Sequence, residues 1–281
     1  MKYGAHIFLW TNRWTREQLP LLARMRKLGL DCAEIAVGDD VTFNAAETGA
    51  HARSLGIELV LSPGALWPME CDISHDDSAL RAKGLAWHRH WIDQAADAGA
   101  AAYTGAIYGH PGRVCRRPQR EDELQWAAEN LHLLAEHAAG LGVKLVLEPM
   151  SHFRTHLVNT PAQAMRLLAI AGHPNISILF DTYHMITEVR DYAAAIRTFG
   201  GRLWGVHACE NDRGVPGGGL VPWPAIAASL AAIGFDGYMI MESYNSSLGE
   251  FAVSRGMFHN VCPDGDAFVR QGMEFLKKRI G

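Results

Sequence analysis

Four side chains that can bind a metal ion or transfer a proton follow apolar runs in the second half of the chain. They are Glu148 in LVLEP, Asp181 in ILFDTYH, His207 in WGVHACEND and Glu242 in MIMESY, separated by 33, 26 and 35 residues. Each apolar run is typical of a buried strand, and an isolated carboxylate is too costly to bury unless it is paired or bound to a metal ion. The pattern therefore predicts that the four side chains share one site.

Three carboxylates and one imidazole form an oxygen-rich set of ligands. Such a set suits Mn²⁺, Mg²⁺ or Co²⁺ better than a structural zinc site, which is usually rich in thiolates. One acid at the end of a strand is more often a helix cap or an ion-pair partner, but four at successive strand ends indicate a shared site. We therefore expect one divalent metal ion per chain, Mn²⁺ by preference, with Co²⁺ or Mg²⁺ as alternatives.

Strand-like apolar runs alternate with helix-like stretches along the whole chain. The predicted strands cover residues 6–10, 32–37, 58–61, 101–107, 144–149, 177–181, 203–207 and 237–242. The predicted helices cover a segment ending at Gly29, then residues 44–55, 78–98, 124–138, 160–171, 189–199, 224–233 and 266–278. Such alternation predicts an α/β protein with a parallel sheet and right-handed crossovers.

Eight strand–helix units of about 35 residues fit the closed (β/α)₈ TIM barrel, which typically has about 250 residues. A doubly wound open sheet is the structural alternative. No linker-like segment divides the chain, so we expect residues 1–281 to form a single domain. The connection 243–265 contains too many apolar residues for a free loop. It is expected to cover the barrel mouth or to meet a partner subunit.

Composition excludes several classes of protein. Lys and Arg total 26 and Asp and Glu total 30, which gives a net charge of −4. This balance does not favour a nucleic-acid partner, whose phosphates require a basic surface. No apolar run approaches the roughly 20 residues of a membrane span, so we expect no membrane partner. Five scattered cysteines, with no CxxC pair, favour reduced thiols and a cytoplasmic location.

The motifs around these residues resemble a known family. LEP at Glu148, FDTYH at Asp181, HACENDRGVPGGG from His207 and MESY at Glu242 resemble the ketose 3-epimerases (D-tagatose and D-allulose 3-epimerases). These enzymes belong to the xylose isomerase-like TIM-barrel superfamily, and the resemblance covers essentially the whole chain. It implies that the four residues bind one divalent ion and that the substrate is a small keto-sugar or related polyol.

The resemblance also implies a mechanism and substrate-binding residues. Glu148 and Glu242 would flank C3 of the ketose, and one would remove its proton while the other returns a proton from the opposite face, through a metal-bound enediolate. His184 and Arg213 would contact the substrate and stabilise its developing negative charge. The family is commonly dimeric or tetrameric, so a homodimer or homotetramer is expected, with residues 251–262 as a candidate interface.

Two positions depart from the family pattern. The epimerases usually carry a glutamate six residues after the first metal-binding glutamate, where this chain has Arg154. An arginine presents a rigid fork of donors in place of an acceptor, and would favour a carboxylate, a phosphate or an additional keto group on the substrate. Alternatively, Arg154 pairs with a nearby acid. His6 stands where the family tends to place an aromatic residue, and either contacts substrate or is a structural core histidine.

Other functions remain as alternatives. The same metal and base would also serve a lyase that expels a leaving group from a keto-sugar or keto-inositol, as inosose dehydratases and C-glycoside deglycosidase subunits do. A DNA-repair enzyme resembling endonuclease IV needs a histidine-rich trinuclear zinc cluster and a basic groove, so charge and ligand set disfavour it. A catalytically inactive binding protein is disfavoured because the ligand set is intact.

Overall fold

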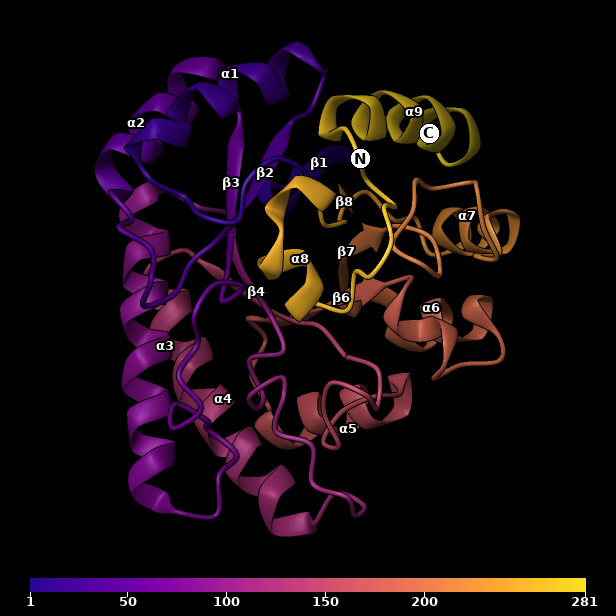
Figure 1. Ribbon diagram of the computed structural model, residues 1–281. Helices are drawn as coiled ribbons and strands as arrows, with labels where there is room; N and C mark the ends of the chain where they lie inside the picture. The colour runs from indigo at the N-terminus through magenta and orange to yellow at the C-terminus, as the bar shows by residue number, and fades with distance from the viewer.

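The chain folds into a barrel of eight parallel strands, seen in a computed structural model that describes residues 1–281 (Figure 1). The strands pair in sequence order, and β1 pairs with β8 to close the barrel. Their bounds are β1 Lys2–His6, β2 Cys32–Ala36, β3 Glu58–Ser62, β4 Ala102–Gly105, β5 Lys144–Leu147, β6 Ile176–Asp181, β7 Leu203–Ala208 and β8 Tyr238–Met241. The (β/α)₈ prediction is confirmed, and the open-sheet alternative is wrong.

Helices surround the barrel and bury its outer face (Figure 1). Their bounds are α1 Leu19–Lys27, α2 Ala45–Leu55, α3 Ser78–Ala98, α4 Glu121–Gly140, α5 Pro161–Ala171, α6 Tyr192–Phe199, α7 Trp223–Ala232, α8 Glu250–Ser254 and α9 Gly265–Arg279. Local sequence sets several of their ends. Thr160 caps α5 through the backbone N–H of Gln163, and Pro161 occupies the first turn, where no backbone donor is needed. No helix combines the length and apolar composition needed to cross a lipid bilayer.

The first strand lies earlier in the chain than its apolar run predicts. The strand prediction for residues 6–10 is wrong, because β1 ends at His6 and Ile7–Leu9 form a 3-10 turn. All three residues of that turn are buried. The segment 243–265 and the start of α9 pack over it, since Asn245 N donates to Phe8 O and a Cβ on Gly265 would lie 2.3 Å from Leu9 O. Burial beneath these segments accounts for the apolar run.

Side chains inside the barrel form layers, because alternate residues of a strand point to the same face. The lower layer is small and apolar, and consists of Cys32, Val60, Ala102, Val146, Leu179 and Ile240 with Gly4 and Gly205 between them. Gly4 is required there, since a Cβ at this position would lie 2.2 Å from the Cys32 sulfur. The residues two positions further along each strand therefore also point inward, toward the carboxyl-terminal mouth.

The segment after β8 covers part of this mouth. Figure 1 shows α8 lying across the open end of the barrel. Arg255 and Met257, which follow α8, line the pocket at the mouth, and Arg255 Nη2 donates to Gly64 O at 2.6 Å. This confirms the expectation that residues 243–265 fold over the barrel.

Candidate metal centre and pocket

The upper layer of the barrel interior is polar on all eight strands. Its members stand two positions after the apolar layer, at or just past the strand ends: His6, Glu34, Ser62, Thr104, Glu148, Asp181, His207 and Glu242. All eight are buried, and six of them line one pocket, while Thr104 donates to Glu34 at 3.0 Å. The strand register thus places four carboxylates and two imidazoles together in a site shielded from bulk water.

The four predicted metal ligands converge within this layer. One ligand atom from each of Glu148, Asp181, His207 and Glu242 lies within 4.8 Å of all the others. His207 Nδ1 is 2.8 Å from Glu148 Oε1, 3.2 Å from Glu242 Oε2 and 3.9 Å from Asp181 Oδ2. The four residues therefore form a candidate metal site at the carboxyl-terminal ends of β5 to β8.

The environment of these atoms fits a bound cation. Asp181 Oδ2 is buried and accepts no hydrogen bond, although Arg213 Nη1 lies 2.8 Å away. The pKa of Glu148 is raised to about 8, chiefly by burial; the attraction of His207 lowers it, and the charges of Asp181 and Glu242 raise it. Burial alone would lower the pKa of His207, but Glu34, Glu242 and Glu148 raise it well above its usual value. The carboxylates thus favour positive charge at this point, as a divalent ion would supply.

Glu34 on β2 is a site residue that we did not predict. Its Oε2 lies 2.7 Å from His207 Nε2, and its Oε1 accepts from the Thr104 hydroxyl. In the neutral imidazole that a metal ion requires, Nε2–H donates to Glu34 and the Nδ1 lone pair faces the carboxylates, which is the usual arrangement of a metal-binding histidine and its supporting carboxylate. A buried acid within the apolar segment CAEIAV is the signal that would have revealed it.

Arg213 lies beside the candidate metal ligands. Its Nη1 is 2.8 Å from Asp181 Oδ2 and donates to Glu242 Oε2 at 2.6 Å, while the Tyr183 ring packs 4.2 Å from its guanidinium carbon. The backbone of Arg213 has φ 68°, which makes it the one non-glycine residue in the left-handed region. Side chains cost free energy in that conformation, and such strain often occurs at functional sites. The loop after β7 is thus held in a shape that directs the Arg213 guanidinium toward the candidate metal site.

His184 completes this side of the pocket. Its Nε2 accepts from Arg213 Nη2 at 3.3 Å, so its Nδ1 carries the proton and donates to Ser151 Oγ at 3.3 Å. Burial lowers the pKa of His184 to about 4 despite the nearby Asp181 charge. A neutral imidazole in this position offers a hydrogen bond without adding charge. The predicted pair His184 and Arg213 therefore lies in contact, next to the candidate metal site.

The two departures from the family pattern also line the pocket. Arg154, in the loop after β5, is half-buried and forms no ion pair, so the alternative in which it pairs with an acid is wrong. His6 is buried at the end of β1, where its Nδ1 accepts from Phe8 N and its Nε2 lies 3.4 Å from Ser62 Oγ. His6 thus combines a structural bond with a position on the pocket wall.

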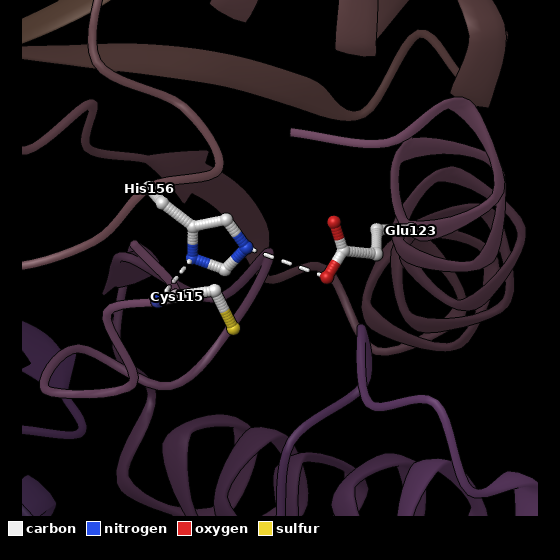
Figure 2. A group of neighbouring side chains, drawn as sticks. All are labelled: Cys115, Glu123 and His156. Atoms are coloured by element: carbon white, nitrogen blue, oxygen red, sulfur yellow. Dashed lines mark hydrogen bonds and ion pairs between the residues drawn. The ribbon is translucent and has the colours of Figure 1, made fainter. Parts of the chain in front are cut away.

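A second group of potential metal ligands lies outside the barrel mouth. Figure 2 shows the His156 ring between Glu123, on α4, and Cys115. His156 Nδ1 accepts from Cys115 N at 3.3 Å, so Nε2 carries the proton and donates to Glu123 Oε1 at 3.3 Å. Arg117 donates to both oxygens of Glu123 at 2.6 and 2.7 Å, and Arg120 N donates to Oε2. Since all acceptor positions of Glu123 are used, this group ties two loops to α4 and is a poor cation site.

Relatives of known activity match most of the chain. It is 28% identical to a D-psicose 3-epimerase from Agrobacterium fabrum over 246 residues, covering 87% of this chain and 85% of the relative. It is 29% identical to an L-ribulose 3-epimerase from Mesorhizobium japonicum over 280 residues, covering 98% and 93%. These relatives are ketose 3-epimerases, which favours the epimerase expectation over the lyase alternative.

A solved structure and a family model agree with this result. The crystal structure of a D-allulose 3-epimerase from Methylomonas sp., in complex with D-allulose, superimposes with a TM-score of 0.92 at 26% identity, covering 99% of this chain and 97% of that one. The model of the xylose isomerase-like TIM barrel matches residues 22–279. The fold, the mouth-facing polar layer and this match lead to one conclusion: the chain belongs to the xylose isomerase-like TIM barrel family.

Proposed function

We propose that the protein is a metal-dependent ketose 3-epimerase, in which Glu148 and Glu242 exchange a proton with C3 of a keto-sugar. The observation that carries this proposal is the arrangement of the two carboxylates around His207. Each approaches His207 Nδ1 through one oxygen, Glu148 Oε1 at 2.8 Å and Glu242 Oε2 at 3.2 Å. The second oxygen of each carboxylate has no protein partner, and both residues line the pocket.

This arrangement suits inversion at a carbon next to a carbonyl group. A divalent ion bound by the four ligands would act as a Lewis acid on the negative charge that develops at the C2 oxygen. The free oxygen of one glutamate takes the C3 proton, and the other glutamate delivers a proton to the opposite face of the planar carbon, which inverts it. Positioned acid–base groups typically contribute about 10²–10⁴-fold to the rate. Arg213, with neutral His184 beside it, balances the charge on the substrate oxygens.

Exchange with deuterated solvent tests the two-base mechanism. We expect Glu148→Gln and Glu242→Gln each to reduce epimerisation at least 10²-fold, because each variant lacks one of the two proton carriers. Each variant should still exchange the C3 proton of one epimer, and the two variants should act on opposite epimers. Glu58→Gln, at the far end of the barrel, is the matched control. Wild-type epimerisation by metal-loaded Glu242→Gln would contradict the mechanism.

We propose that the resident ion is Mn²⁺, one per chain, with Co²⁺ and Mg²⁺ as the competing ions. Three carboxylates and a single imidazole support an oxygen-preferring divalent ion. Elemental analysis of the purified protein and calorimetric titration with each ion would rank them. Asp181→Asn should weaken the binding of all three ions, because it removes the charge of a ligand without altering the shape of the side chain.

We further propose that the chain forms a homodimer or homotetramer in the cytoplasm. The exposed side chains of Val253 and Phe258, in residues 251–262, support a subunit interface there. All five cysteines are free, which supports a reducing compartment. Light scattering of wild type and Phe258→Ser would test the interface, since only an assembly through this segment would dissociate in the variant.

A further inference from the structure

Three arginines line the pocket, and only one of them is neutralised by the protein. Arg213 is paired with Asp181 and Glu242 at 2.8 and 2.6 Å. Arg154 and Arg255 also line the pocket, and neither forms an ion pair with a carboxylate. Both are half-buried, and partly removing a cation from water without a counter-ion costs free energy, so two such groups in one pocket favour a ligand that supplies negative charge.

Of the two arginines, Arg154 is the one whose guanidinium has fewer contacts with the protein. It lies in the loop after β5, six residues beyond Glu148, and its guanidinium makes no hydrogen bond to the protein. Burial lowers its pKa, and the positive charges of Arg255 and Arg213 lower it further. The groups that act most strongly on it are two tyrosines and two arginines, with no carboxylate among them. The donors of Arg154 are therefore available to a ligand.

Arg255 also lines the pocket, and it belongs to the segment after β8 that covers the mouth. Its Nη2 donates to Gly64 O at 2.6 Å, and its guanidinium carbon lies 5.1 Å from the centre of the Phe251 ring. These contacts fix the direction of the side chain, but a neutral carbonyl and an aromatic ring leave its full charge uncompensated. The fold thus brings two arginines, about 100 residues apart in sequence, to one pocket.

The position of this pair relative to the candidate metal site identifies the part of a substrate that it would meet. Glu148, His207 and Glu242 belong to the inner layer of the barrel, whereas Arg154 and Arg255 belong to loops above it. A ketose with C2 and C3 at the carboxylates extends its remaining carbons toward those loops. We propose that the substrate carries an oxyanion, a terminal carboxylate or phosphate monoester, at the end remote from C3, and that Arg154 and Arg255 bind it. This inference rests on the proposed function for its orientation of the sugar.

Matched substrates test the proposal on the manganese-loaded protein. We would measure kcat/KM for fructose, fructose 6-phosphate and fructuronate, and for ribulose and ribulose 5-phosphate. An oxyanion subsite predicts at least a tenfold preference for one charged class over the neutral sugars, and the preferred class distinguishes phosphate from carboxylate. A higher kcat/KM for the neutral sugars than for every charged sugar would overturn the proposal.

Variants separate charge recognition from general damage. Arg154→Gln should reduce the preference for the charged over the neutral sugar at least tenfold, mainly by raising the KM of the charged sugar. Arg255→Gln should act in the same direction. Arg190→Gln, an exposed arginine outside the pocket, is the matched control and should change neither class. An unchanged preference in Arg154→Gln would overturn the proposal.

Calorimetry with sulfate distinguishes failure of the subsite from failure of the proposed function. Sulfate binding that is lost in Arg154→Gln but kept in Arg190→Gln would support the subsite even if no ketose exchanged its C3 proton, in which case only the proposed function fails. Conversely, C3 exchange on neutral ketoses, with no sulfate binding and no effect of Arg154→Gln, would overturn the subsite and leave the proposed function standing.

Discussion

At the scale of single residues, Glu34 shows how the barrel prepares a ligand before any ion binds. Its carboxylate holds His207 through Nε2 and is itself held by Thr104. Burial alone would raise the pKa of Glu34, but its interactions with His207 lower it, so Glu34 remains charged at neutral pH. A charged acceptor on Nε2 increases the electron density at Nδ1, the atom that faces the other ligands.

Glu34→Gln tests this role, because glutamine keeps the shape of the side chain but removes its charge. We expect the affinity for Mn²⁺ to fall about 10–100-fold, which is typical for loss of a group that supports a metal-binding histidine. Calorimetric titration of metal-free protein would measure the change. Glu58→Gln changes the same functional group at the other end of the barrel and should leave the affinity unaltered. Equal affinities in wild type and Glu34→Gln would contradict the role.

At the scale of elements, Glu123 connects α4 to two loops: the loop that precedes α4 and the loop after β5 that contains His156. Its carboxylate accepts from Arg117, the backbone of Arg120 and His156, and its side chain is fully buried. Burial would raise the pKa of Glu123, but these hydrogen bonds outweigh it and lower the pKa to about 2. A carboxylate with a lowered pKa stabilises the fold above its usual pKa of 4.5, and this contribution is lost as the pH falls toward 2.

Glu123→Gln should therefore destabilise the protein in a pH-dependent manner. At pH 7 we expect a loss of about 1.5–3 kcal/mol in the free energy of unfolding, typical of hydrogen bonds to a charged group. The difference between wild type and variant should shrink steadily below pH 4.5. Urea unfolding at a series of pH values would measure it, with exposed Glu121→Gln as the control. A difference that stays constant down to pH 3 would show that the charge of Glu123 is not responsible.

Elements also explain what could be predicted from the sequence. Alternation of strands and helices was sufficient to predict the barrel, and carboxylates after apolar runs were sufficient to predict the candidate metal site. The same rule applied to residues 32–37 would have found Glu34. The first strand was misplaced because Ile7–Leu9 owe their apolar character to burial under residues 243–265 and α9. Arg255 could not be predicted, since its approach to Arg154 depends on the path of that covering segment.

At the scale of the whole molecule, the charge of the site is balanced for three of its four carboxylates and not for the fourth. Against the effect of burial, the charges of Arg213 and His207 lower the pKa of Asp181 and Glu242, whereas burial and the neighbouring carboxylates leave the pKa of Glu148 raised to about 8. A ligand that binds only the folded state stabilises it by an amount set by its concentration relative to its dissociation constant. The metal ion is therefore expected to contribute to folding as well as to catalysis.

Thermal unfolding with and without Mn²⁺ tests this coupling. At a Mn²⁺ concentration of about 100 times its dissociation constant, the folded state gains about 2.7 kcal/mol, which corresponds to an increase in Tm of about 5–10 °C for a chain of this size. Asp181→Asn should lose most of that increase, because it removes a ligand. Arg154→Gln should keep it, because Arg154 lies at the pocket wall and binds no ion. An equal increase in Tm in wild type and Asp181→Asn would place the stabilising ion elsewhere. Loss of the Tm increase in Arg154→Gln would mean that the proposed oxyanion subsite and the metal site are not independent.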